Sequence, residues 1–290
     1  MTHSCSVDKN QWDELHTKLI EAGLKDIPSS SEYEEWRMKS FATAILYKSG
    51  KLVVQGQDIS KLVEVVDRVL NENSSSGVSI LNEIGADEVG KGDYFGPLVV
   101  SAVYVNSSQA KIIKKIGAVD SKKLSDRDIG LIASKIKKIV QFKTQVITPE
   151  EYNKRYSEVK NVSILLAEAH ADNVLSLIGS IRKPIDRVVI DQFSSMKSRL
   201  NNAFGQRLGN VELVQLHRAE SEVSVAAASV LARAEFITQM DIMSKKYAMN
   251  FPKGAAHVVG FARDFVQKYS ADELKKVAKI TFRTTKEVLS

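Results

Sequence analysis

Four acidic residues of this sequence stand at the ends of apolar, strand-like segments. Asp87 and Glu88 follow the segment SILNEIGA, Asp191 ends RVVID, and Glu220 ends VELVQLHRAE. Because functional groups gather at the carboxyl ends of parallel strands, we expect the four side chains to meet at one edge of a sheet. Carboxylates that meet repel one another unless cations hold them, and Mg²⁺ and Mn²⁺ are hard ions that take oxygen ligands. Two such ions about 3.5–4 Å apart can hold the attacking and leaving oxygens of a phosphodiester.

Two of these acids also have a purely structural interpretation. Glu220 precedes a predicted helix, where a negative charge stabilises the positive end of the helix dipole. Asp191 could bond the backbone of its own turn. The pair Asp87-Glu88 lies between glycines after an apolar strand, a setting that is harder to explain as solvated surface. This pair therefore carries most of the metal-binding hypothesis.

The segment GADEVGKGDYFGP (85–97) also has the G-x-x-x-x-G-K spacing of a phosphate-binding P-loop. A P-loop needs Ser or Thr after its Lys, and here Gly92 follows Lys91. It also needs a helix whose N-terminus points at the phosphates, whereas a β-branched strand follows here. Asp87 and Glu88 would repel phosphate from within the loop. We therefore interpret the segment as an acidic site and the glycine spacing as coincidence.

From residue 78 onward the sequence has the pattern of an α/β domain. Strand-like segments occupy 79–87, 97–105, 141–149, 187–193 and 211–220, and helical segments occupy 124–140, 160–182 and 221–240. Ser221 is the expected N-cap of the last helix. Because strand and helix alternate in the second half, we predict parallel strands joined by crossover helices.

The first 72 residues predict a separate, small α+β domain. QWDELHTKLIEAGL (11–24) reads as a helix ended by Gly23, and DISKLVEVVDRVL (58–70) as an amphipathic helix. Between them, MKSFATAILY (38–47) and KLVVQG (51–56) predict a hairpin that turns at Gly50. NENSSSG (71–77) is small and polar, which is typical of a linker. We therefore expect domains at 1–72 and 80–290, with a linker at 73–79.

Composition and charge narrow the class of protein. Apolar residues make up 43% and charged residues 26% of the 290 residues, as in ordinary globular proteins. Residues 1–76 carry 9 Lys and Arg against 12 Asp and Glu, whereas residues 77–290 carry 32 against 23, so a polyanionic partner suits the larger part. The single cysteine excludes an internal disulfide. No apolar leader or run of about 18 apolar residues is evident. We expect a soluble, monomeric, cytoplasmic protein that binds no membrane.

Four separated motifs, taken in order, resemble the type 2 ribonucleases H and, within them, ribonuclease HIII. The motifs are GADEVGKGDYFGPLVVSAVYV (85–105), VDSKKLSD (119–126), VVIDQF (188–193) and HRAESEVSVAAASVLARAEF (217–236). The resemblance covers about residues 80–290 and implies a ribonuclease H-like mixed sheet with flanking helices. Residues 1–72 resemble the small N-terminal domain of ribonuclease HIII, which looks like half of a TATA-binding protein and binds substrate.

The resemblance implies metal-dependent cleavage of the RNA strand of RNA–DNA hybrids. Asp87, Glu88, Asp191 and Glu220 match the family's metal-binding quartet, with Asp87 expected to bridge two Mg²⁺ or Mn²⁺ ions. The expected products carry 5′-phosphate and 3′-hydroxyl ends. Backbone groups of Gly90-Lys91-Gly92 could reach the ribose 2′-hydroxyl that distinguishes RNA from DNA. Ser121, Lys122 and Lys123 match the family's phosphate-contacting motif, although a solvated basic turn would look the same.

Two features separate the sequence from ribonuclease HII. The fourth acid is Glu220, where ribonuclease HII has Asp, and Lys91 stands where ribonuclease HII has the Arg that helps to sense a single ribonucleotide joined to DNA. The departure at Lys91 argues against cleavage at single ribonucleotides in duplex DNA. Such cleavage is kept as one alternative, and hybrid binding without catalysis is the other. His170 and His217 could be proposed as bases, but we expect structural roles because a metal-generated hydroxide needs no imidazole.

The N-terminal domain is expected to bind a duplex despite its net charge of −3. Lys39, Lys48 and Lys51 are candidates for a locally basic sheet face, with Tyr47 and Gln55 beside them. The alternative is an appendage that serves only packing or solubility.

Overall fold

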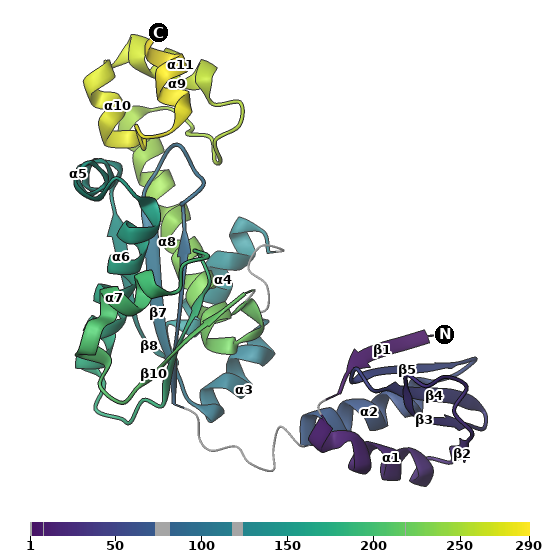
Figure 1. The fold of residues 1–290 in the computed structure, drawn as a ribbon. Coiled ribbons are helices and arrows are strands. Elements are labelled where there is room, and N and C mark those ends of the chain that lie inside the picture. Colours follow the sequence, from purple (N-terminus) through teal and green to yellow (C-terminus); the bar gives the residue numbers. More distant parts are fainter. Residues whose placement is uncertain (1, 8, 73–81, 118–123, 218) are drawn as a thin grey trace. The chain divides into compact units, whose positions relative to one another are not determined.

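The structure, a computed structural model, describes residues 2–7, 9–72, 82–117, 124–217 and 219–290. The chain divides into two compact units, Met1–Ser79 and Ile80–Ser290 (Figure 1). The first unit is a small α+β body, and the second holds the acidic motifs.

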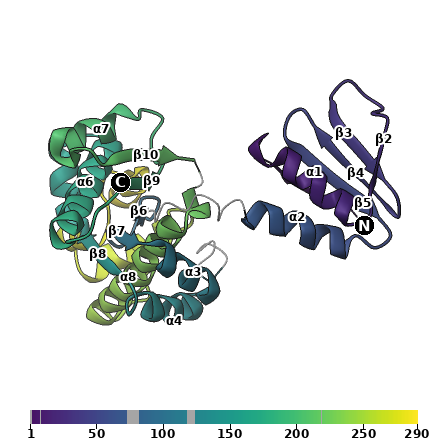
Figure 2. The same ribbon diagram turned by 90° about the horizontal axis from the view of Figure 1, so that it is seen from below.

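The N-terminal unit is an antiparallel sheet covered on one face by two helices. Its strands are β1 (Thr2–Ser6), β2 (Lys25–Ile27), β3 (Glu34–Lys39), β4 (Ala42–Tyr47) and β5 (Lys51–Gly56), in the order β1-β5-β4-β3-β2. Its helices are η1 (Lys9–Gln11), α1 (Trp12–Glu21) and α2 (Ser60–Glu72). Leu15 and Leu19 of α1 and Leu62 and Val66 of α2 share one core with the sheet. The two helices lie on the same side of the sheet in both views (Figures 1 and 2).

The predicted hairpin is present, but the prediction of a single strand over 38–47 was wrong. Strand β4 begins at Ala42 and pairs with β5 across a turn in which Gly50 has a φ of +82°. Met38 belongs to the preceding strand, β3, and the chain reverses between Lys39 and Ala42. Strands β1, β2 and β3 were not predicted from the sequence. THSCS and KDI are short and polar, and the apolar-polar alternation of EEWRMK spans only its last four residues, so pairing with neighbours rather than local pattern defines these strands.

The C-terminal unit is built on a mixed sheet in the order β10-β9-β6-β7-β8. Its strands are β6 (Glu83–Val89), β7 (Leu98–Val105), β8 (Gln141–Ile147), β9 (Arg187–Asp191) and β10 (Glu212–Leu216). Strands β6, β7 and β8 form an antiparallel meander. Strands β9 and β10 run parallel to β6, so the parallel pairing predicted for the second half is present.

Helices cover both faces of this sheet (Figure 2). They are α3 (Ser107–Ile116), α4 (Asp126–Ile136), α5 (Pro149–Val159), α6 (Val162–Ser180), α7 (Ser198–Phe204), η3 (Gly205–Leu208), η4 (Ala219–Ser221), α8 (Val223–Tyr247), α9 (Val259–Lys268), α10 (Ala271–Val277) and α11 (Arg283–Leu289). Helices α6 and α7 pack on one face, and α8, with α3 and α4, packs on the other. Every residue of β7 is buried because both of its faces are covered.

Of the nine α-helices described in this unit, three were predicted and six were not. Helices α4, α6 and α8 correspond to the segments expected at 124–140, 160–182 and 221–240. The prediction that Ser221 caps α8 was wrong, because Ser221 ends the short helix η4 and Glu222 precedes α8 without a side-chain capping bond. Helix α5 shows why others were missed: it buries only Pro149 and Tyr152, so its apolar periodicity is weak.

Helix α6 is, among the described residues, the one helix long and apolar enough to cross a membrane by length and composition. Half of that stretch is buried inside the unit, where Leu165, Leu166 and Ala169 contact β7, β8 and α5. The core helix of a globular unit can be as long and as apolar as a membrane span, so the packing of α6 accounts for its apolar composition.

The C-terminal helices hold the segment that follows the acidic pair. Tyr94 and Phe95 are completely buried in one core with α8, α9 and α10. Lys279 is also fully buried, and its ammonium donates to the backbone carbonyls of Asp93 at 2.9 Å and Gly96 at 2.7 Å. Burial lowers the pKa of Lys279 to about 7. The segment after β6 is therefore held in place by Lys279, which lies more than 180 residues later in the chain.

Candidate active site

Asp87 and Glu88 point to opposite faces of strand β6. Side chains alternate along a strand, so Asp87 lies on the face covered by α8 and Glu88 on the face covered by α6. The hydroxyl of Ser229 on α8 bonds Asp87, and His170 on α6 bonds Glu88. The two neighbouring acids thus approach the site from the two sides of the sheet.

Asp191 lies beside Asp87 because β6 and β9 run parallel. Ala86 pairs with Ile190, so the next residues along the two strands, Asp87 and Asp191, are level and on the same face. Parallel pairing thus brings Asp87 and Asp191 side by side, as the sequence pattern indicated, but Glu220 lies in the short helix η4 and not at the end of a strand. That these acids bind metal stays a prediction.

The surroundings of Asp87 disfavour its charged form. Asp87 is 9% exposed. Its pKa is raised to about 7, chiefly by burial and next by the charge of Glu88, with a smaller contribution from Asp191. Hydrogen bonds from the Ser229 hydroxyl and from the Glu88 amide, at 2.8 Å, act in the opposite direction without cancelling the effect. Asp87 is therefore a buried carboxylate with acidic neighbours and no positively charged partner among the described residues.

The short helix η4 carries the fourth acid of the predicted quartet. Asp191 Oδ1 accepts a hydrogen bond of 2.9 Å from the amide of Ala219, which is buried at the start of η4. This bond attaches η4 to the end of β9, next to Asp87. Glu220 is the middle residue of η4, but its side chain lies outside the described part of the structure.

The donor set suits a hard divalent cation. Among the described residues, no Lys or Arg forms an ion pair with Asp87 or Asp191, and both acids face the same space. Carboxylate oxygens without a protein cation are the ligands that Mg²⁺ and Mn²⁺ prefer. The side chains that the structure describes do not by themselves form a group of three or more metal ligands, and Glu220 is not among them. The chemistry of the site fits a metal, and Glu220 would have to complete it.

The glycines of the 85–97 segment have different physical causes. A Cβ at Gly85 would lie 2.2 Å from the backbone of Ser224, so Gly85 lets α8 pack against β6. Gly90 has a φ of +96°, and a Cβ there would lie 2.2 Å from the carbonyl oxygen of Pro97. Gly92 is exposed, with no atom within 4 Å of its Cβ position. The segment leads into β7 rather than a helix, which agrees with rejecting the P-loop.

Lys91 makes a contact that the sequence did not indicate. Its ammonium donates to the backbone carbonyl of Phe193 at 3.0 Å and lies 5.9 Å from the centre of the Phe193 ring. The glycine motif is thereby joined to the loop that follows Asp191. Ser121, Lys122 and Lys123 lie outside the described residues.

Two residues at the site were missed as functional candidates. His170 was expected to be structural, yet its Nε2 lies 3.0 Å from Glu88 Oε2. Ser229 was not a functional candidate, yet it bonds Asp87. The only available signal was a polar residue inside an otherwise apolar helical stretch. His217, the other histidine considered as a base, is exposed.

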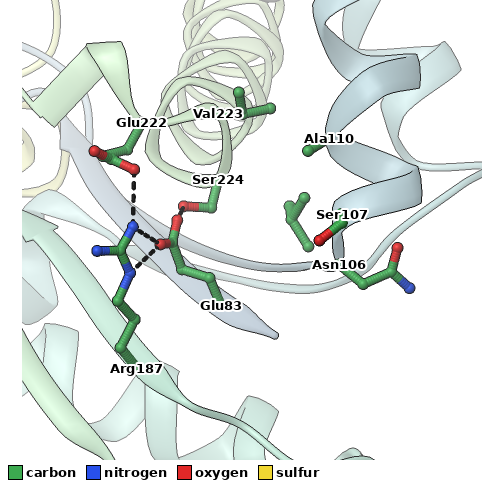
Figure 3. Close-up of a pocket in the computed structure, with 9 residues that line it drawn as sticks. Glu83, Asn106, Ser107, Ala110, Arg187, Glu222, Val223 and Ser224 are labelled. Atoms are coloured by element: carbon green, nitrogen blue, oxygen red, sulfur yellow. Dashed lines mark hydrogen bonds and ion pairs between the residues drawn. The ribbon is translucent and has the colours of Figure 1, made fainter. Parts of the chain in front are cut away.

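A second polar cluster lies at the opposite end of the same two strands, beside a cavity of about 140 Å³ (Figure 3). Arg187 bonds Glu83 at 2.5 Å and Glu222 at 3.0 Å. The hydroxyl of Ser224 also donates to Glu83. Arg187 thus connects β9, β6 and the junction between η4 and α8, and here a buried carboxylate has its counter-charge.

Comparisons with known proteins extend over both units. The family model described as Ribonuclease HII matches residues 84–285. Ribonuclease HIII of Protochlamydia amoebophila (strain UWE25) is 34% identical over 291 residues, covering 95% of each chain. Ribonuclease HIII of Chlamydia pneumoniae is 35% identical over 300 residues, covering 100% of this chain and 97% of that protein.

A solved structure shows the same fold. The crystal structure of Bst-RNase HIII in complex with Mn²⁺ matches with a TM-score of 0.71 at 26% identity, covering 100% of this chain and 98% of that chain. The expected fold class, a mixed sheet with flanking helices, is confirmed. The likeness of residues 1–72 to half of a TATA-binding protein stays a prediction.

Proposed function

The chain belongs to the ribonuclease HIII family and is therefore an endonucleolytic ribonuclease H. From this premise we propose that it cuts the RNA strand of RNA–DNA hybrids with two divalent ions, Mg²⁺ or Mn²⁺. The observation that carries the metal requirement is the position of Asp87. Burial and the charges of Glu88 and Asp191 raise its pKa to about 7, and bound cations would supply the missing positive charge. The Mn²⁺ complex of Bst-RNase HIII supports the same proposal.

Each acid has a proposed part in holding the ions. Asp87, with Glu88 and Asp191 as its charged neighbours, would be a ligand shared by the ions, and Glu88 and Asp191 would be further ligands. Glu220 would be brought in by η4, which the bond from Ala219 to Asp191 attaches to the site. Bound ions would activate a water and stabilise the leaving 3′-oxygen, giving 5′-phosphate and 3′-hydroxyl ends.

We propose that the turn Gly90-Lys91-Gly92 recognises the 2′-hydroxyl of the ribose. Gly85 and Gly90 are required by packing and backbone conformation, whereas the space around Gly92 is open. A backbone amide or carbonyl there could approach a 2′-hydroxyl without a side chain in the way. Lys91 would fix the turn through Phe193. Ser121, Lys122 and Lys123 are proposed phosphate contacts.

The remaining proposals concern the whole chain. We propose residues 1–72 as a substrate-binding domain, 73–79 as a linker and 80–290 as the catalytic domain. Lys39, Lys48 and Lys51 are exposed on the N-terminal unit and are candidate duplex contacts. A cytoplasmic, monomeric enzyme is the proposed working form.

One experiment tests the core of this proposal. Wild-type protein and Asp87→Asn are assayed with labelled RNA–DNA hybrid, single-ribonucleotide duplex DNA and double-stranded RNA, each with Mg²⁺, Mn²⁺ or EDTA. We expect wild-type cleavage of the hybrid only with metal, and none by the variant. Cleavage in EDTA would contradict the metal requirement. Preference for the single ribonucleotide would instead assign ribonuclease HII-like specificity.

A further inference from the structure

His170 is a fully buried histidine with one bonded and one unbonded ring nitrogen. Its side chain is 0% exposed, and Nε2 lies 3.0 Å from Glu88 Oε2. Nδ1 is buried without a hydrogen-bond partner among the described residues. The ring stacks on Phe193, with centroids 5.2 Å apart and planes inclined by 6°. His170 therefore has one polar contact, and that contact is a proposed metal ligand.

The contact with Glu88 determines which nitrogen carries the proton. Nε2 faces a carboxylate oxygen at 3.0 Å, so a lone pair on Nε2 would repel Oε2, whereas an N–H there forms a hydrogen bond. His170 therefore donates its Nε2 proton to Glu88, and Nδ1 has no partner among the described residues.

This bond constrains how Glu88 can present its oxygens. The Glu88 side chain is 10% exposed, and His170 holds Oε2 on the α6 side of the sheet. The other oxygen, Oε1, is then the one proposed to bind metal. Without the donor, the carboxylate could rotate, and ligand groups held by outer hydrogen bonds typically lose metal affinity when those bonds are removed.

Phe193 extends the same contact to the substrate side. Its ring orients His170, and its carbonyl accepts the ammonium of Lys91 at 3.0 Å. Phe193 also follows Asp191 by two residues, on the loop that leaves β9. His170 and Phe193 therefore connect Glu88, the exit of β9 and the glycine turn.

We propose that His170 is a positioning residue that orients Glu88 for metal binding by donating its Nε2 proton to Oε2. This inference rests on the proposed function, since it assumes that Glu88 is a metal ligand. It predicts that the hydrogen-bond donor matters and that the imidazole ring as such does not.

Three substitutions separate the donor from the ring. His170→Phe keeps an aromatic ring on Phe193 and removes the donor. His170→Gln places an amide donor near the Nε2 position, and His170→Asn carries the same amide one methylene shorter, out of reach of Glu88. Mn²⁺ binding is measured by calorimetry on the full chain, together with the thermal midpoint, kcat and KM for a hybrid.

The donor model predicts a specific pattern. His170→Phe and His170→Asn should weaken Mn²⁺ binding by roughly 10–100-fold and lower kcat, with KM for the hybrid changed by less than about twofold. His170→Gln should stay within several-fold of wild type. Should His170→Phe fail to fold, His170→Gln and His170→Asn give the same comparison. Wild-type affinity in a folded His170→Phe or His170→Asn would overturn the proposal, and so would a loss in a folded His170→Gln equal to the loss in His170→Asn.

A double variant tests whether His170 acts through Glu88. In the Glu88→Gln background, His170→Phe should cause no further loss of Mn²⁺ binding, because the two residues contribute through one contact. Independent, additive losses would refute the positioning role. Absence of Mn²⁺ binding by the wild-type chain would instead refute the proposed function itself.

Discussion

The two ends of the strand pair β6–β9 carry the same kind of residue in opposite electrostatic states. At one end Glu83 stands level with Arg187, and four residues later on the same face Asp87 stands beside Asp191. Glu83 is buried but bonded to Arg187 and Ser224. Asp87 is as deeply buried and is surrounded by other acids. Both carboxylates are buried, so burial does not distinguish the candidate active site at Asp87 from the ion-paired cluster at Glu83. The distinguishing feature is that Asp87 has no positively charged partner among the described residues.

The two ends also differ in what they contribute to stability. A buried carboxylate with an Arg partner is costly to disrupt, since removal of one partner leaves an isolated buried charge. A buried acid among acids destabilises the fold until a cation is bound, as is common at functional sites. Strand β6 is therefore held at its beginning and electrostatically strained at its end.

The largest expected effect is the loss of catalysis in Asp87→Asn, with a gain in stability. Hydrolysis should fall by at least about 10³-fold, or about 4 kcal/mol of transition-state stabilisation. In EDTA at pH 8 the variant should melt above wild type, because a repelled buried charge is removed. Single-turnover assays and calorimetric melting measure the two changes. A variant less stable than wild type under these conditions would break the comparison.

Arg187→Ala should have the next largest effect, and it should act on stability. Removing the guanidinium leaves Glu83 buried without its counter-charge, which typically costs about 3–5 kcal/mol. Urea unfolding measures the loss. Arg187→Lys is the matched control and should recover part of it. A negligible change in Arg187→Ala would mean that Glu83 is not held by this pair.

The metal-free protein should lose stability as pH rises from about 4 to about 7. The carboxyl of Asp87 has a pKa of about 7 in the fold against 3.8 ordinarily, so in this range the folded state binds more protons than the unfolded state. The free energy of unfolding then decreases with pH, by roughly 2–4 kcal/mol from this group, and this contribution is constant above pH 7. Unfolding in EDTA at several pH values tests it, with Asp87→Asn as the control that lacks the titrating group. Parallel pH profiles for the two proteins would disprove it.

The smallest expected effect is stabilisation by metal. Mn²⁺ at a hundred times its dissociation constant should raise the free energy of unfolding by about 2.7 kcal/mol, since it binds the folded state. Thermal melting with and without Mn²⁺ measures the shift, which should be much reduced in Asp87→Asn. An equal shift in both proteins would place the ion elsewhere.

Particular residues show where prediction from sequence succeeded. Asp87, Glu88 and Asp191 end apolar runs, and parallel strands bring such residues together by a rule that needs no tertiary detail. Helix α6 was predicted nearly to its ends because its apolar run is long. Strands β1 to β3 were missed because their polar residues are ordered by neighbours rather than by their own pattern.

The sequence by itself determined the acids, the order of the main elements and the family, because these depend on residue identity and local periodicity. Only the tertiary structure decided which face each acid occupies and what surrounds it. Glu88 meets His170 across 82 positions of sequence, and Asp191 holds the amide of Ala219 across 28. Such contacts depend on how α6 and η4 pack against the sheet. Packing of distant segments, and the charge balance that it creates, is the information that local patterns do not contain.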